Sequence, residues 1–553
     1  MCGIWALLSQ KKIQNFGKLY EAFMKIQPRG PDNSSFQLLN PFTLLGFHRL
    51  AIMDLTAEGN QPFHHVRQDG SCVYCVCNGE IYPHEELKKE YDIVTKSHSD
   101  CEVIIPLYEK VGVKKLCELL GSEFAFIIFD ISKDGNVKMV CGRDPIGVRP
   151  MFYGVDDSSI CLASEMKGMS DVYDKCYVFP PGHFMIYEDG KMQLEAYYKY
   201  EYKELDPVPP IEQVYEEIRN RFKNCVRKRL MADRPIGALL SGGLDSSLVA
   251  GMMIHLIETE FPQLHDKEIH FFSIGFSSGS TDIPYAIEVA EFLKKKHPKI
   301  KHHIVTIEEA DAIKAIDETI FALESYDITS IRASIVNRLI SKYVSENTNV
   351  RVLLGGDGHD ENCLGYRYEL YAPSVLAAKE DGIRLVREVH MFDGKRADRC
   401  PAHHNLEARL PFCDPEYIDY IFSLPAELIA PVNGIEKYTP RKAFSGKNII
   451  PESVCWRTKQ AFSDAVSKKE RSLFEMIQEY IDTIITNEEY LSNKDKYKHN
   501  TPFTKESYYY RKKFVEYFGD SEEKSRIIPH FWMPKFVQNV SDPSARVLSV
   551  YKE

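Results

Sequence analysis

The sequence has no uninterrupted apolar run of the roughly 18–20 residues that a helix needs to cross a bilayer. It also lacks an N-terminal basic segment followed by an apolar core, the pattern of a secretory signal peptide. Positive charge is not in excess, since 69 Lys and Arg face 80 Asp and Glu and the net charge is −11. We therefore expect a cytoplasmic protein with neither a membrane nor a nucleic acid as partner.

The 14 cysteines follow neither a disulfide framework nor a zinc spacing. Cys72, Cys75 and Cys77 come closest to a metal pattern, but no second CxxC and no pair of histidines follows at zinc spacing. Because these three cysteines alternate within an apolar run, we expect them in a core strand. Scattered thiols of this kind suit a reducing compartment.

At 553 residues the chain is too long for one hydrophobic core, so we expect two or three domains. Its hydrophobic content of 44% and its charged content of 27% are ordinary for globular proteins. A polar stretch with three prolines, residues 202–212, predicts a linker. The linker separates a first domain at residues 1–200 from a second domain at residues 212–553.

Residues 236–253 have the pattern of a short buried strand, a Gly/Ser loop and the start of a helix. The loop, SGGLDSS at 241–247, lacks the Gly-Lys-Ser/Thr of a Walker A loop. Its glycines let the backbone approach a ligand, and the helix dipole favours negative charge, so the pattern predicts an anion site. The plainer alternative is a strand–turn–helix connection with serine as N-cap. SGGLDSS resembles the pyrophosphate-binding loop of ATP pyrophosphatases, which cleave ATP to AMP and pyrophosphate.

Cys2 offers a nucleophile together with a base. If Met1 is removed, the thiol and the α-amine of Cys2 share one carbon. An α-amine titrates near pH ~7.7–8.0, so it can act as a base toward the adjacent thiol near neutral pH. Taken alone, a cysteine at position 2 is better explained as a small residue tolerated after methionine.

Further motifs follow Cys2 in the first domain. In order, they are CGI at 2–4, RGPD at 29–32, HRLAI at 48–52, NGEIY at 78–82, SDCE at 99–102, FAF at 124–126 and GRDxxGVRP at 142–150. Together they resemble the class II glutamine amidotransferase family, although Pro28 stands where family members often have histidine. The resemblance implies an N-terminal-nucleophile hydrolase fold, an αββα sandwich with two antiparallel sheets between helices.

This family resemblance implies a glutamine site in the first domain. Cys2 would attack the amide carbon of glutamine, and the Asn78 side chain with the Gly79 amide would form the oxyanion hole. The Arg49 guanidinium would bind the α-carboxylate through two parallel hydrogen bonds, while Glu80 and Asp100 would pair with the ammonium group. The implied glutamine-binding residues are Arg49, Leu50, Ala51, Ile52, Met53, Asn78, Gly79, Glu80 and Asp100.

Strands and helices alternate in the second half of the chain. The patterns predict strands at 236–240, 269–276, 302–307 and 350–354, and helices at 211–230, 246–261, 284–296, 308–323 and 332–346. This alternation predicts a doubly wound parallel sheet with its ligand at the carboxyl ends of the strands. Residues 465–527, rich in Lys, Glu, Tyr and Asn, predict solvated helices that form a mobile cover near the site.

The order of motifs in this half resembles the synthetase domain of the asparagine synthetases. Beyond SGGLDSS, the matching stretches are 325–334, 396–399, 406–412, 433–437, 459–464, 508–511 and 542–546. The resemblance implies that aspartate attacks the α-phosphorus of ATP, giving β-aspartyl-AMP and pyrophosphate. Ammonia from glutamine would then pass through an intramolecular tunnel and displace AMP to give asparagine. Glutamine, aspartate and ATP would be the substrates, Mg²⁺ the cofactor and a homodimer the expected assembly.

The same resemblance assigns roles in the second domain. Asp245 and Asp360 would hold magnesium, and Lys459 would contact phosphate or the adenylate. The implied ATP-binding residues are Leu240, Ser241, Gly242, Gly243, Asp245, Ser246, Ser247, Ile274, Gly355 and Gly356. The implied catalytic residues of the whole chain are Cys2, Asn78, Gly79, Asp357 and Lys459.

One loop departs from the family pattern. The family sequence SGEGSDE is GGDGHDE at 355–361, so Gly355 and His359 replace serines and Asp357 replaces a glutamate. The shorter arm of Asp357 leaves a shortfall of ~1 Å, which is enough to slow a reaction ~100-fold. Three readings therefore stand beside a glutamine-hydrolysing synthetase. They are a glutaminase with a weakened or silent synthetase site, a noncatalytic sensor or scaffold, and a related ligase with another acid substrate.

Overall fold

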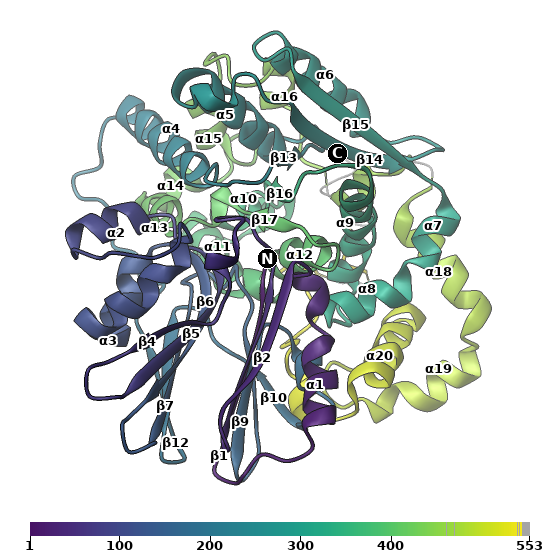
Figure 1. Cartoon of the computed structure of the whole chain (residues 1–553). Coiled ribbons are helices and arrows are strands. Elements are labelled where there is room, and N and C mark those ends of the chain that lie inside the picture. Colours follow the sequence, from purple (N-terminus) through teal and green to yellow (C-terminus); the bar gives the residue numbers. More distant parts are fainter. Residues whose placement is uncertain (461, 469–470, 539, 541, 545–553) are drawn as a thin grey trace.

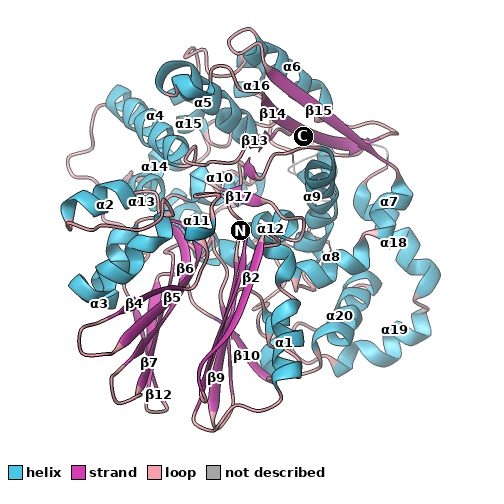
Figure 2. Ribbon diagram, viewed as in Figure 1, coloured by secondary structure: helices cyan, strands magenta, loops and turns pink. Residues whose placement is uncertain are grey.

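The computed structural model describes residues 1–553 except 461, 469–470, 539, 541 and 545–553. Two antiparallel sheets lie in the N-terminal part of the chain, and a parallel sheet flanked by helices lies in the C-terminal part (Figures 1 and 2). Among the helices that the structure describes, none combines the length and the apolar character needed to span a membrane.

The first antiparallel sheet has the strand order β10-β8-β9-β1-β3-β2, and the second has the order β12-β11-β7-β6-β5-β4. The strands of the first are β1 (Gly3–Ser9), β2 (Asn33–Asn40), β3 (Thr43–Arg49), β8 (Phe152–Val155), β9 (Ser159–Ala163) and β10 (Lys175–Val178). Those of the second are β4 (Phe63–Val66), β5 (Cys72–Glu80), β6 (Glu123–Ile131), β7 (Val137–Arg143), β11 (His183–Glu188) and β12 (Lys191–Ala196).

The two antiparallel sheets pack face to face, with Ile4, Phe47, Val76 and Ile127 in the shared core. Helix α1 (Phe16–Met24) covers the outer face of the first sheet, and α2 (His84–Glu90) and α3 (Ile104–Leu120) lie beside the second. The predicted αββα sandwich is therefore confirmed. The alternation of Cys75 and Cys77 is also explained, because both lie buried in β5.

The C-terminal sheet has the order β15-β14-β13-β16-β17, and every pairing is parallel. The predicted parallel sheet is confirmed, with one further strand, β17, that the pattern did not indicate. A three-residue strand is too short to show a period of two. The strands of the C-terminal sheet are β13 (Ile236–Leu239), β14 (Ile269–Phe276), β15 (Ile300–Ile307), β16 (Val352–Leu354) and β17 (Glu407–Arg409).

Helices cover both faces of this sheet, and the predicted helix at 308–323 is two helices, α7 and α8. The helices up to residue 402 are α4 (Ile211–Lys228), α5 (Leu244–Glu260), α6 (Ile283–Lys294), α7 (Glu309–Lys314), α8 (Ile316–Leu323), α9 (Ile328–Asn347), α10 (His359–Asn362), α11 (Val375–Glu388) and α12 (Asp393–Ala402). Those that follow are α13 (Pro415–Ser423), α14 (Ala426–Ile429), α15 (Tyr438–Phe444), α16 (Glu452–Cys455), α17 (Phe462–Ala465), α18 (Leu473–Ile484), α19 (Asn487–Asn493), α20 (Lys505–Phe518) and α21 (Glu522–Ser525).

The prediction of solvated helices at 465–527 is wrong for most of that segment. Helices α18 and α20 pack against each other, and α20 also packs against α8 and α9. They bury Ile477, Tyr510 and Phe514 in the same core as the parallel sheet. Glu475 and Glu479 of α18 and Glu516 of α20 lie on the exposed faces of these helices, and the many charged residues of the segment concealed the apolar stripe. The motif residues Ala545 and Arg546 lie outside the described part of the chain.

The two halves of the chain are in extensive contact. Leu50 and Val148 from the first half share a buried cluster with Phe222 of α4 and with Leu410 just after β17. The N-terminus lies at this junction, beside β17 (Figure 1). Cys2 is therefore held between the antiparallel sheets and the second domain.

A buried histidine in the first sheet should make stability depend on pH. His48 stacks on Phe23 with ring centroids 3.8 Å apart, and burial lowers its pKa to about 4. Its Nε2 donates to the carbonyl of Phe23 at 3.1 Å, and its Nδ1 accepts from Ser34 Oγ at 2.7 Å. In the unfolded chain a histidine takes up its proton near pH ~6.5. The stabilisation is therefore complete above about pH 6.5 and is lost as the pH falls toward 4.

We expect His48→Asn to flatten this pH dependence. Between about pH 6 and 4.5 the slope of the unfolding free energy should decrease by up to one proton, about 1.4 kcal/mol per pH unit. Urea unfolding at several pH values measures this slope. His265→Asn, at an exposed position, is the control and should leave the slope unchanged. An unchanged slope in His48→Asn would contradict the assignment of a neutral, buried ring.

Candidate active sites

The first candidate site surrounds Cys2, which immediately precedes β1. Its Sγ donates to the carbonyl oxygen of Leu50 at 3.6 Å, and burial raises the pKa of the thiol to about 11. Met1 is buried, and its α-ammonium lies 3.6 Å from Glu407 Oε2. While Met1 is attached, the free α-amine is that of Met1. Cys2 then has no α-amine that could act as the base for its own thiol.

Asn78 at the end of β5 is fully buried, and neither atom of its side-chain amide has a hydrogen-bond partner. Unpaired buried polar atoms cost about 1–3 kcal/mol each. They therefore mark a place where a polar ligand can bind, as the predicted oxyanion hole requires. Gly79 also has a packing role, because a Cβ there would lie 2.3 Å from the carbonyl oxygen of Glu123 on β6.

Arg49 ends β3, and its guanidinium faces the loop at residues 53–60. It donates to the Thr56 carbonyl at 2.7 Å, to Asn60 Oδ1 at 2.8 Å and to the carbonyls of Met53 and Asp54. Both terminal nitrogens of Arg49 already donate to the chain itself. In this structure they are therefore not available for the predicted pair of hydrogen bonds to a carboxylate. The sequence indicated the charge of Arg49 but not its neighbours.

Glu80 and Asp100 lie close to the junction between the domains. Glu80 Oε2 lies 3.1 Å from Arg409 Nη2, and Asp100 Oδ2 accepts a hydrogen bond from the Ile81 amide at 2.5 Å. Burial raises the pKa of both carboxyl groups above the ordinary range. Leu50, Ala51 and Ile52 follow Arg49 and are buried, and the Leu50 carbonyl accepts the hydrogen bond from Cys2 Sγ.

Charged residues outside the predicted set complete this site. Arg29 Nε donates to the Cys2 carbonyl at 2.9 Å, and its terminal nitrogens pair with Glu165 and with Asp398 of α12. Glu407 and Arg409 of β17 reach it from the second domain. Arg29, Glu407 and Arg409 lie inside motifs named from the sequence, RGPD at 29–32 and the stretch at 406–412, but a motif does not show which domain a side chain will face.

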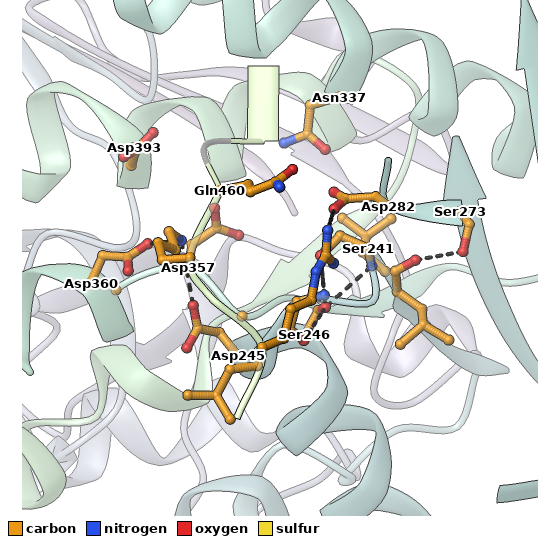
Figure 3. Close-up of a pocket in the computed structure, with 18 of the residues that line it drawn as sticks. Ser241, Asp245, Ser246, Ser273, Asp282, Asn337, Asp357, Asp360, Asp393 and Gln460 are labelled. Atoms are coloured by element: carbon orange, nitrogen blue, oxygen red, sulfur yellow. Dashed lines mark hydrogen bonds and ion pairs between the residues drawn. The ribbon is translucent and has the colours of Figure 1, made fainter. Parts of the chain in front are cut away.

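The second candidate site is a cavity of about 150 Å³ at the carboxyl ends of β13, β14 and β16. Figure 3 shows Asp245, Asp357 and Asp360 on one side of it, across from Ser273 and Asp282. Ten residues predicted from the sequence line it: Leu240, Ser241, Gly243, Asp245, Ser246, Ile274, Gly356, Asp357, Asp360 and Lys459.

Three predicted residues, Gly242, Ser247 and Gly355, are not part of the lining. Gly242 has a φ of +80°, and a Cβ there would lie 2.4 Å from the Ala286 amide of α6, so this glycine permits close packing. Ser247 is buried, and Gly355 donates its amide to the Arg409 carbonyl at 3.0 Å. These three residues therefore support the loops through packing and hydrogen bonding instead of facing the cavity.

Two carboxylates and two lysines meet in the cavity. Lys437 Nζ lies 2.7 Å from both Asp245 Oδ1 and Asp360 Oδ1, and Lys459 Nζ lies 2.5 Å from Asp360 Oδ2. Burial alone would raise the pKa of Asp245, but Lys437 and His359 hold it well below its ordinary value. Lys437, within the NGIEK motif, is a site residue that the sequence analysis did not single out.

The carboxylates of this cluster fit a magnesium ion. Glu361 Oε2 is buried and accepts no hydrogen bond, whereas Asp360 Oδ1 is paired with Lys437 Nζ at 2.7 Å. Protein magnesium sites commonly use one or two carboxylates and complete the shell with water and substrate phosphates. No group of three or more His, Cys, Asp or Glu side chains suited to a metal occurs among the described residues.

The loop that departs from the family pattern lies in this cavity. Asp357 Oδ1 pairs with Arg396 Nη2 of α12 at 2.6 Å, and burial raises the pKa of Asp357. His359 Nδ1 lies 2.6 Å from Asp245 Oδ1. Gly356 permits the two loops to touch, because a Cβ there would lie 2.6 Å from the Ser246 amide. Two of the three substitutions in the loop therefore contact site residues directly.

We expect Asp357→Glu to preserve or raise the activity of this site. The longer arm restores the reach of a glutamate, and a shortfall of ~1 Å can cost ~100-fold in rate. Pyrophosphate release from ATP with aspartate and ammonia measures the effect. Asp357→Asn keeps the short arm without the charge and is the matched comparison. A total loss in Asp357→Glu would show that the loop has adopted a geometry with no room for the longer side chain.

The fold and the two sites define a two-domain amidotransferase. Residues 1–176 match the family model described as a glutamine amidotransferase domain, and residues 217–389 and 377–532 match the model described as asparagine synthase. The chain belongs to the family of glutamine-hydrolysing asparagine synthetases.

Two relatives carry that conclusion. The chain is 39% identical over 578 residues to the glutamine-hydrolysing asparagine synthetase of Gallus gallus and 38% identical over 581 residues to that of Homo sapiens. In both comparisons 100% of this chain and 99% of the relative are covered. Among solved structures, the glutamine phosphoribosylpyrophosphate amidotransferase of B. subtilis aligns with a TM-score of 0.31 at 14% identity, over 55% of this chain and 81% of that chain. This structural likeness is too low to support an argument.

Proposed function

We propose that this protein makes L-asparagine from L-aspartate, with ATP as co-substrate and with ammonia from glutamine. The products are asparagine, AMP, pyrophosphate and glutamate. The observation that carries the proposal is the pair of sites in one chain. The first has a partly buried cysteine next to β1 and the unpaired Asn78 amide on β5, and the second is a loop-lined cavity with paired carboxylates and lysines. Neither site alone accounts for the reaction.

In the first site, glutamine hydrolysis begins with Cys2. After removal of Met1, the α-amine of Cys2 takes the thiol proton, and the sulfur attacks the side-chain carbonyl carbon of glutamine. Asn78 and the Gly79 amide stabilise the oxyanion, which is typically worth several kcal/mol. Ammonia leaves, and water then cleaves the thioester to release glutamate. Arg49, Glu80 and Asp100 bind the amino-acid end, which requires the Arg49 guanidinium to exchange at least one loop carbonyl for the carboxylate.

In the second site, the β-carboxylate of aspartate attacks the α-phosphorus of ATP and pyrophosphate leaves. The amides of the 241–247 loop and Lys459 bind the phosphates, with Leu240, Ile274 and Gly356 beside the nucleotide. Ammonia then attacks the β-aspartyl-AMP and AMP leaves. Asp245 and Asp360 would hold Mg²⁺, which when bound would neutralise phosphate charge. The two half-sites belong to domains at residues 1–200 and 212–553.

The deciding experiment supplies ATP, magnesium and aspartate to the purified protein, with either ammonia or glutamine. Pyrophosphate and asparagine are quantified together. Equal amounts of both products from either nitrogen source support the proposal. Glutamate formation without aspartate-dependent pyrophosphate would instead favour the second candidate, a glutaminase with a weakened or silent synthetase site.

The second candidate rests on the altered loop at 355–361. Asp357 is short, and His359 takes one oxygen of Asp245. Against it, Asp245, Asp360, Glu361 and Lys459 all line the cavity.

We further propose a cytoplasmic location and a homodimeric assembly, which fractionation and light scattering test.

A further inference from the structure

A histidine occupies a position where the family has serine, in direct contact with a proposed magnesium ligand. His359 opens α10 and is fully buried. Its ring stacks on Phe412 with centroids 3.9 Å apart and an interplanar angle of 7°. The stack and the burial fix the orientation of the ring, so the direction of its N–H bond is fixed as well.

The contacts of the ring define its tautomer. The Asp245 carboxylate can only accept a hydrogen bond, so Nδ1 carries the proton and donates to Asp245 Oδ1 at 2.6 Å. Nε2 accepts from the hydroxyl of Tyr417 at 3.4 Å.

This donation leaves Asp245 with unequal oxygens. Oδ1 accepts from His359 Nδ1 and also from Lys437 Nζ at 2.7 Å, whereas Oδ2 accepts from Lys437 Nζ at 2.7 Å and lies 3.7 Å from Lys459 Nζ. A carboxylate offers about two lone-pair positions on each oxygen. Oδ1 is therefore saturated, and only Oδ2 has a position left for a cation.

We propose that His359 is a positioning residue that restricts Asp245 to one-oxygen coordination and thereby makes the site select Mg²⁺ over Ca²⁺. The inference rests on the proposed function, because it concerns the same magnesium site. Mg²⁺ takes six ligands in a near-ideal octahedron and is satisfied by one oxygen of a carboxylate. Ca²⁺ takes six to eight oxygens and gains from carboxylates that bind through both. A serine side chain is shorter than imidazole and has no ring to stack on Phe412, so it cannot impose the same restriction.

Metal binding can be measured without turnover. The free Mn²⁺ signal in electron paramagnetic resonance reports binding to the protein in the presence of α,β-methylene-ATP, which cannot release pyrophosphate. Mg²⁺ and Ca²⁺ are then titrated to displace Mn²⁺, and the ratio of their displacement constants gives the selectivity. We expect His359→Ser to reduce the preference for Mg²⁺ about tenfold, in the range typical of groups that orient metal ligands.

Two further variants at position 359 keep the proposal testable if His359→Ser folds poorly. His359→Leu fills similar space without a donor and should lose selectivity as His359→Ser does. His359→Asn places a side-chain N–H where Nδ1 was, and it should retain most of the selectivity. Loss in the asparagine variant equal to that in the serine variant would overturn the proposal, since packing rather than donation would then matter.

His48 offers a matched control in the other domain. It is also buried and stacks on Phe23 at 3.8 Å and 10°, but its ring nitrogens contact a hydroxyl and a carbonyl instead of a carboxylate. His48→Ser should cost similar stability and leave metal selectivity unchanged. If the wild-type protein binds Mn²⁺ but shows the same selectivity as His359→Ser and His359→Leu, the inference is wrong. If the wild-type protein binds no Mn²⁺ at all, the proposed magnesium site itself fails.

Discussion

Cys2→Ala is expected to abolish glutamine-dependent asparagine synthesis and to leave ammonia-dependent synthesis intact. Alanine has no thiol to form the thioester, and loss of a nucleophile typically costs at least about 10⁴-fold. The second site receives free ammonia without Cys2, because its cavity lies at the carboxyl ends of a separate sheet. Asparagine and glutamate formed from glutamine or from ammonium at fixed pH measure the two activities separately.

Cys161→Ala is a suitable control for this variant. Cys161 is buried in β9, which pairs directly with β1, so the substitution tests the effect of losing a thiol in the same sheet. It should keep both activities. Equal loss of both activities in Cys2→Ala would contradict the two-site arrangement. Mass spectrometry of the wild-type N-terminus should find Met1 absent from active protein, because only then does Cys2 carry its own amine.

Asp245→Asn is expected to show the reverse pattern, with pyrophosphate release reduced and glutamine hydrolysis retained. The amide has the size of the carboxylate but no charge for magnesium or for Lys437 and Lys459. Removing one group that stabilises transition-state charge typically costs about 10²–10³-fold in rate. Pyrophosphate release and glutamate formation, measured on the same preparation, give the two activities.

The Cys2→Ala variant can also be mixed with Asp245→Asn to test whether ammonia passes within one chain. A mixture of the two variants contains one intact glutaminase site and one intact synthetase site, on different chains. If ammonia passes within a chain, the mixture should make little asparagine from glutamine when an ammonia-consuming enzyme is added. Full pyrophosphate release by Asp245→Asn would show that Asp245 has no role in ATP chemistry, and the proposed phosphate site would have to be placed elsewhere.

Local patterns predicted most of the fold because they act over a few residues. The strand at 269–276 has the predicted bounds, and the helix at 211–230 ends only two residues early. The helix has apolar residues at regular helical spacing, and the strand is a nearly continuous apolar run. The segment at 465–527 was predicted wrongly because the apolar residues of α18 and α20 are separated by many charged ones. Burial of such a helix depends on the neighbour it meets, which a single segment does not specify.

In the candidate sites, too, some features were predicted from local sequence and others were not. SGGLDSS was placed correctly at the end of β13, because a glycine-rich turn after a buried strand has few other conformations. The surroundings of Arg49 were not predictable, since its partners are carbonyls of a loop whose path depends on the packing of the domains. The contribution of Glu407 and Arg409 to the first site was missed for the same reason.

The sequence by itself determined which chemical groups this protein has and the elements that hold them: a cysteine before β1, Asn78 and Gly79 near the end of β5, and loops at the ends of parallel strands. Tertiary structure alone decided which of these groups meet. It brought His359 and Lys437 to Asp245, engaged Arg49 with its own loop, and set Glu407 beside the N-terminus. The physical reason is range: backbone preferences and apolar periodicity act between neighbours in sequence. Charge pairing and burial act between residues that only the folded chain makes neighbours.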